Sequence, residues 1–162
     1  LPLEERYSYN KNYLLDQLMV MLAGRGAELT VFENQSTGAS NDLERATDIA
    51  QSMVKEWGMS DKIGPMAWGS SSSIFLGDEM MSSKKYSDET AKLIDDEASA
   101  ILKQSEIRTH KVLIEFRKGL DAIAQSLIEK EEISGSEVGQ LVDDAMGKEC
   151  ANSITSIDVD IS

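Results

Sequence analysis

The chain has 162 residues, of which 41% are hydrophobic and 28% charged, a balance typical of a folded globular domain. Its net charge of −13 at pH 7 argues against nucleic acid or an anionic membrane surface as a partner, because their phosphates would meet a repulsive field. The single cysteine, Cys150, excludes an intrachain disulfide and a cysteine-rich zinc site. No apolar run approaches the roughly 20 residues that cross a bilayer.

The first predicted helix covers about residues 11–27. Its apolar side chains recur at steps of three and four residues, and Asn10 is placed to cap its start. Gly24 and Gly26 weaken the last turns. Residues 29–32 form a short segment with β-branched side chains and are expected to be irregular or extended.

A polar loop, residues 33–40, leads to the second predicted helix. Ser40 or Asn41 is expected to cap it, and Gly58 is placed to end it. Its apolar stripe has alternating steps of three and four residues and consists of Leu43, Ala46, Ala50, Met53 and Trp57.

The middle of the chain is rich in Gly and Ser and is predicted to be a linker, residues 69–86. It separates residues 1–68 from a second helical unit, residues 87–146. Ser87 is expected to cap a long helix there, with Asp88 and Glu89 at its positive end. Its predicted apolar stripe consists of Ile94, Ala98, Ile101, Leu102, Ile107, Val112, Leu113 and Phe116.

Gly119 is expected to break or bend the long helix, and a second segment continues to about Glu131. Residues 134–136 form a predicted turn before a short helix, residues 137–146. Residues 147–162 lose periodicity and are expected to be a disordered tail. The predicted fold is all-α, a mainly helical unit followed by a hairpin or bundle of long helices.

Few residues can support catalysis. Metal-assisted hydrolysis needs roughly three protein ligands, whereas this chain has one histidine and one cysteine. His110 lies between Arg108 and Lys111 on the long helix and is expected to be a solvated surface residue. No Ser-His-Asp arrangement can be completed beyond that residue, and no Gly-rich phosphate loop is present.

Most carboxylates are expected on solvated helix faces, but two of them are candidates for another role. Asp42 falls in the first turn of the second helix, where the dipole favours a carboxylate, so capping is preferred over metal binding on the residues alone. Glu28 falls at the end of the first helix, where the dipole disfavours its charge. Structural pairing, for example with Arg25, is preferred there over a functional use. The residues alone thus indicate an acidic helical domain without a complete active site.

Residues 36–47, S-T-G-A-S-N-D-L-E-R-A-T, are very similar to a signature segment of the FtsH-type proteases. Further segments resemble that family in the same order along the chain, and all but the tail is covered. They are residues 1–7, 22–28, 53–65, 74–77, 86–91 and 127–131. Many collinear segments make the resemblance specific.

The resemblance implies a zinc endopeptidase fused behind an AAA ATPase module. Its homo-hexamers thread membrane proteins and misfolded soluble proteins into an internal chamber. In that family two histidines of an H-E-x-x-H helix bind Zn2+, and the glutamate between them is the general base for the attacking water. The third ligand is the aspartate of the Asn-Asp pair, which is Asp42 here, so the resemblance overrides the capping preference.

H-E-x-x-H is absent from the chain, and the family places it upstream of residues 1–7. We therefore expect a fragment, inactive alone, whose parent carries ATP and Mg2+ in the ATPase module. The resemblance also implies an N-terminal membrane anchor, with the protease domain facing the bacterial cytoplasm or an organelle interior. Gly26 stands where the family commonly has Ala, and Leu29 where it has an acidic residue; Glu28 is a secondary candidate near the site. The alternatives are a non-catalytic assembly or adaptor module and a degenerate pseudoprotease.

Overall fold

The computed structural model describes residues 9–68 and 86–150. Within these ranges the chain is helical and contains no strand, which confirms the predicted all-α fold class. The elements are α1 (Lys11–Phe32), the 3-10 helix η1 (Thr37–Ala39), α2 (Ser40–Lys55), α3 (Asp88–Glu115), α4 (Arg117–Lys130) and α5 (Gly135–Met146). Among the described helices, none combines the length and the hydropathy that a membrane span requires.

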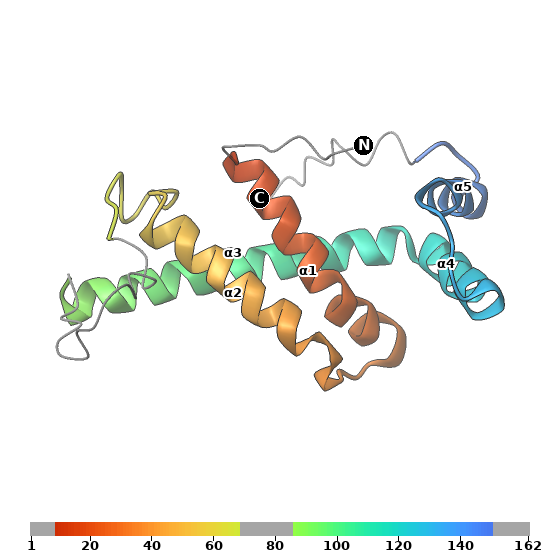
Figure 1. Ribbon diagram of the computed structural model, residues 1–162, viewed down its shortest axis with the longest axis horizontal. Helices are drawn as coiled ribbons and strands as arrows, with labels where there is room; N and C mark the ends of the chain where they lie inside the picture. The colour runs from red at the N-terminus through yellow and green to blue at the C-terminus, as the bar shows by residue number, and fades with distance from the viewer. Residues whose placement is uncertain (1–8, 69–85, 151–162) are drawn as a thin grey trace, which may run out of the picture.

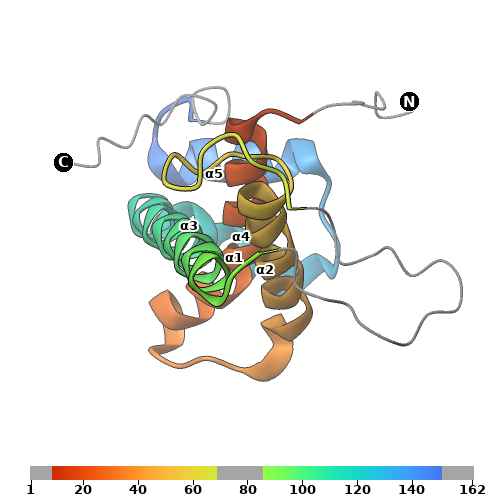
Figure 2. The ribbon, with the colours of Figure 1, turned by 90° about the vertical axis from the view of Figure 1, so that its left-hand side faces the viewer.

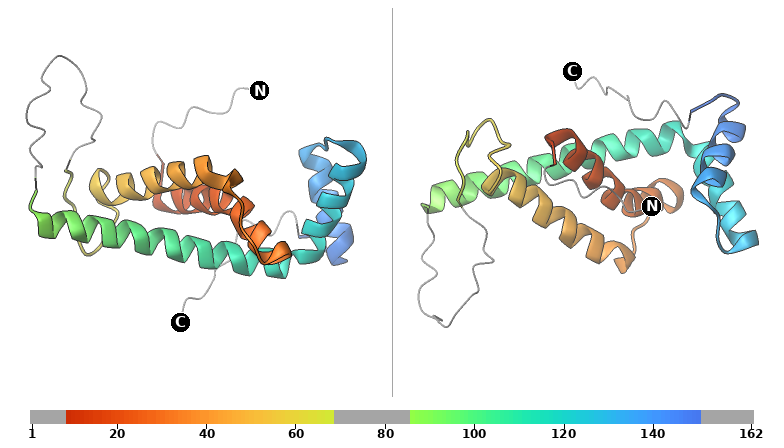
Figure 3. Two further views of the ribbon diagram at one scale, coloured as in Figure 1. Left: turned by 90° about the horizontal axis from the view of Figure 1, so that it is seen from below. Right: turned by 45° about the horizontal axis from the view of Figure 1, so that its top comes forward.

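Three helices form the core, and two stand apart from it. α1 crosses α3, while α2 packs against both α1 and α3 (Figures 1 and 2). α4 and α5 pack on each other at one end of α3 and lie across it (Figure 3). The predicted linker falls almost wholly in residues 69–85, outside the described residues, and helices on both sides of it share one core.

The core consists of two adjoining clusters of buried side chains. The first joins α1 to α2 and contains Leu14, Leu18, Ala46 and Met53. The second joins α2 to α3 and contains Ala50, Val54, Ile94 and Ala98. Leu18 and Met53 are completely buried, and each such side chain stabilises the fold by roughly 1.5–3 kcal/mol.

α1 is longer than the sequence predicts. Asn10 caps its start as expected, accepting a hydrogen bond of 2.8 Å from the Tyr13 N–H. The expectation that residues 29–32 are irregular is wrong, because the helix runs to Phe32 through both glycines. A Cβ on Gly26 would lie 2.9 Å from Leu113 Cδ1, so this glycine lies where α3 passes close by. Packing against a neighbouring helix thus outweighs the low helix propensity of glycine.

α2 begins differently from the prediction. The residue at its N-cap is Ala39, without a side-chain cap, rather than Ser40 or Asn41. η1 leads directly into it, and Ser36 caps η1 by accepting a hydrogen bond from the Gly38 N–H. The helix ends at Lys55, so Trp57 lies beyond it and is 46% exposed instead of completing the apolar stripe.

α3 begins where the sequence predicts, and the first half of its predicted stripe, Ile94, Ala98, Ile101 and Leu102, faces the core, but its second half differs from the prediction. Ser87 caps it, accepting from the Thr90 N–H at 3.2 Å. Ile107, expected in the stripe, is 49% exposed, whereas Ser105 and Thr109 are buried. The Thr109 hydroxyl hydrogen-bonds the carbonyl oxygen of Ser105 at 2.8 Å, so its burial leaves no unpaired donor. Small side chains at these positions allow α1 to approach.

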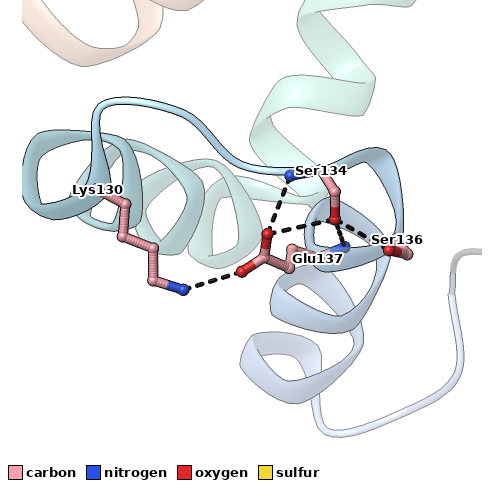
Figure 4. A network of polar contacts seen from close by, with 4 residues as sticks. All are labelled: Lys130, Ser134, Ser136 and Glu137. Carbon is pink, nitrogen blue, oxygen red and sulfur yellow. Dashed lines mark hydrogen bonds and ion pairs between the residues drawn. The ribbon is translucent and has the colours of Figure 1, made fainter.

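The bend between α3 and α4 lies at Phe116, not at Gly119 as predicted. Gly119 is inside α4 and is buried against α5, where a Cβ added to it would lie 3.1 Å from Val142 Cγ2. α5 begins with a reciprocal capping box, in which the Ser134 hydroxyl accepts from the Glu137 N–H and the Glu137 carboxylate accepts from the Ser134 N–H (Figure 4). Lys130 of α4 adds an ion pair of 2.9 Å to that carboxylate. These contacts join the two helices of the hairpin.

Candidate metal centre

Asp42 is the third residue of α2, at the point where the chain returns from the end of α1. Its side chain is exposed and, among the described residues, takes part in no hydrogen bond or ion pair. The capping role preferred on the residues alone is therefore wrong, since α2 has no side-chain cap. The positive end of the helix still favours a carboxylate at this position.

The donor chemistry of Asp42 fits a zinc ligand. A carboxylate oxygen binds zinc at roughly 2.0–2.2 Å, and no internal partner competes for this one within the described part of the chain. Within residues 9–68 and 86–150 there is no group of three or more His, Cys, Asp or Glu side chains that could hold a metal ion. Asp42 therefore has the donor chemistry of one zinc ligand, and the described residues do not bring together a set of three.

Glu28 lies about one turn before the end of α1 and binds the following loop. Its Oε2 accepts from the Ser36 N–H at 2.8 Å, and its Oε1 accepts from the Ser36 hydroxyl at 2.7 Å. These two hydrogen bonds, the one from the hydroxyl above all, lower the pKa of the Glu28 carboxyl. Arg25, the partner suggested by sequence, lies instead 3.6 Å from Glu106 of α3.

Ser36 connects Glu28 to the start of α2. Its hydroxyl oxygen also accepts from the Gly38 N–H at 3.2 Å, which caps η1. The Ser40 N–H then bonds the Thr37 carbonyl, and α2 follows without a break. Sequence reasoning missed this role of Ser36. The Ser-Thr-Gly run signals a local turn, but nothing in it points to a carboxylate eight residues earlier.

His110 does not have the environment that the sequence predicts. It is half-buried, and its Nδ1 lies 3.2 Å from the Thr30 hydroxyl of α1. The Thr30 hydroxyl donates to the Gly26 carbonyl at 2.7 Å, so the Nδ1–H of His110 donates to Thr30. The expectation of a fully solvated histidine is wrong because α1 extends far enough to cover the ring.

Comparison with known proteins gives the class and then the family. The described residues are helical, and the carboxylate of Asp42 in the S-T-G-A-S-N-D run has no partner among them, which are features of an FtsH-type protease domain. The sequence model described as peptidase family M41 matches residues 1–141. The chain belongs to peptidase family M41 and is part of an FtsH-type protease domain.

The curated relatives are much longer than this chain. It is 49% identical over 147 residues to the "ATP-dependent zinc metalloprotease FtsH" of Acidimicrobium ferrooxidans, which covers 91% of this chain and 22% of the relative. Against "FtsH 3" of Petrotoga mobilis the identity is 49% over 143 residues, 88% of this chain and 22% of the relative. The identity to the Thermotoga maritima FtsH is 42% over 149 residues, which cover 91% of this chain and 24% of that relative. The chain thus spans less than a quarter of the length of these relatives.

Proposed function

We propose that this chain is part of a membrane-anchored, ATP-dependent zinc endopeptidase that degrades membrane proteins and misfolded soluble proteins. The observation that carries the proposal is the state of Asp42. It is an exposed carboxylate at a helix start, without a partner among the described residues, inside the family's S-T-G-A-S-N-D run. The names of the relatives, ATP-dependent zinc metalloproteases, support the same reaction class.

In this proposal Asp42 is one of three protein ligands to zinc. The other two are the histidines of an H-E-x-x-H helix elsewhere in the full-length protein, and the glutamate of that motif is the general base. Zinc, when bound, supplies the Lewis-acid chemistry that activates water for attack on a peptide carbonyl. Because one carboxylate binds zinc far more weakly than a set of three ligands, we expect this chain alone to be inactive.

The remaining parts of the proposal concern the whole protein. Residues 1–68 belong to the protease core, and a linker at residues 69–86 joins them to the helical bundle of residues 87–146, whose first helix, α3, packs into the same core. An ATPase module that binds ATP and Mg2+ drives substrate entry, and the subunits assemble as a homo-hexamer. An N-terminal anchor holds the protein in the membrane, with the protease domain facing the bacterial cytoplasm or an organelle interior.

The test is Asp42→Ala in the purified full-length protein. We expect loss of stoichiometric zinc, measured by elemental analysis after dialysis, and loss of peptidase activity, because an open metal site with two remaining ligands holds zinc weakly. The matched control is Asp48→Ala, which removes another exposed carboxylate from α2 and should leave both readings unchanged. Full zinc content and full proteolysis in Asp42→Ala would refute the proposal.

A further inference from the structure

The start of α2, where Asp42 lies, contains no fully buried side chain. None of residues 33–45 is buried, and the first buried side chain of α2 is that of Ala46. η1 likewise contributes no buried residue. Besides the helix itself, hydrogen bonds that hold the loop between α1 and α2 therefore help to fix the position of Asp42.

One side chain of α1 forms hydrogen bonds with this loop. Among the described residues, Glu28 is the only side chain of α1 that hydrogen-bonds residues 34–45, and it does so with both oxygens, at 2.7 and 2.8 Å. Both bonds go to Ser36, six residues before Asp42. A carboxylate near the C-terminal end of a helix is disfavoured by the helix dipole, so its place here calls for such partners.

The connection from Ser36 to Asp42 is short and regular. The Ser36 hydroxyl accepts from the Gly38 N–H, and the three residues of η1 lead straight into α2. A shift of Ser36 would thus be carried to the first turn of α2. In metal sites, groups that orient a ligand without touching the metal typically change the affinity about 10–100-fold when they are removed.

We propose that Glu28 is a positioning residue for the metal centre. By holding Ser36, it sets where α2 begins relative to α1 and so places the carboxylate of Asp42 for zinc. Glu28 acts through Ser36 and is not itself a ligand. This inference rests on the proposed zinc role of Asp42.

The experiment compares three variants of the full-length protein by competition of bound zinc against a chelator. Glu28→Ala removes both hydrogen bonds and is expected to weaken zinc binding by about 10–100-fold. Glu28→Gln should keep nearly native affinity, because the amide can accept from the Ser36 N–H and donate to the Ser36 hydroxyl. Ser36→Ala should be intermediate, since it removes the bonds of the hydroxyl and leaves the bond from the backbone N–H.

Two further measurements separate positioning from general stability. Glu44→Ala removes an exposed carboxylate of α2 and should leave the zinc affinity unchanged. Amide hydrogen exchange of the metal-free protein should show faster exchange at Ser36 and Gly38 in Glu28→Ala but not in the core around Leu18. If Glu28 acted through its negative charge, Glu28→Gln would bind zinc as weakly as Glu28→Ala.

The possible results are distinct. Unchanged zinc affinity in Glu28→Ala would overturn the inference, and so would a Glu28→Gln affinity as weak as that of Glu28→Ala, because the carboxylate would then act by its charge. Zinc retained in Asp42→Ala would instead overturn the proposed function. If Asp42→Ala loses zinc and Glu28→Ala does not change the zinc affinity, the inference about Glu28 is refuted and the proposed function is not.

Discussion

At the scale of single residues, the surroundings of each glycine decide what a methyl group would do. Gly24 is inside α1 on an exposed face, and a Cβ there would have no atom within 4 Å. Glycine in a helix interior costs about 0.5–1 kcal/mol relative to alanine. We expect Gly24→Ala to raise the free energy of unfolding by about that amount, measured by urea denaturation followed by circular dichroism.

Gly119→Ala is the matched control for this prediction. It also lies inside a helix, but its Cβ would come 3.1 and 3.3 Å from the two methyl groups of Val142. Because the side chain of Val142 is branched and stiff, the contact offsets the gain in helix propensity. A stabilisation by Gly119→Ala as large as that by Gly24→Ala would contradict the packing of α4 on α5.

At the scale of elements, the link between α4 and α5 depends on pH. The Ser134 N–H is the main cause, with Lys130 next, that lowers the pKa of Glu137 from 4.5 to about 2. A carboxyl group whose pKa is lowered in the folded state stabilises that state at pH values above its ordinary pKa. This stabilisation is lost as the pH falls towards the lowered pKa. The contribution of Glu137 is therefore present above pH 4.5 and is lost between 4.5 and about 2. The carboxyl carbon chemical shift of Glu137 in an NMR titration should show this low midpoint.

Lys130→Met separates the two causes. It removes the ion pair of 2.9 Å with Glu137 and leaves the hydrogen bond of 3.0 Å from the Ser134 N–H (Figure 4). The pKa of Glu137 should then rise only part of the way back. A Glu137 carboxyl that titrates at 4.5 in the unaltered protein would show that the capping box does not form.

At the scale of the whole molecule, we expect the α4–α5 hairpin to open as a separate cooperative unit. Within the described part of the chain, α5 contacts α4, α4 contacts the end of α3, and one hydrogen bond of 3.1 Å joins Arg117 to the Thr30 carbonyl of α1. Few contacts therefore couple the opening of the hairpin to that of the three-helix core. Ser134→Ala should lower the opening free energy of α5 amides by about 1 kcal/mol, measured by native-state hydrogen exchange.

In the same experiment, the amides around Leu18 and Met53 should be unaffected by Ser134→Ala, because these residues are buried in the other unit. An equal fall in protection at both places would mean that the five helices open together.

What could be read from the sequence is local along the chain. The starts of α1 and α3 followed from Asn10 and Ser87, whose side chains bond backbone N–H groups three residues on. The apolar period predicted three of the four core residues of α2, missed Val54 and wrongly included Leu43 and Trp57. The collinear segments indicated the family and singled out Asp42. Each cap, each apolar period and each family segment is read from a short stretch of the chain, so none of these signals requires knowledge of a partner helix.

What only the tertiary structure decided depends on pairs of residues far apart in sequence. Gly26 stays helical because α3 packs against it, and Thr109 is buried because α1 covers it. The partner of Glu28 is Ser36 because the chain turns back after α1. The spacing of residues in the sequence does not predict that turn. Helix length, the burial of small polar side chains and the hydrogen bonds of a loop follow from which surfaces meet, and a local pattern does not contain that information.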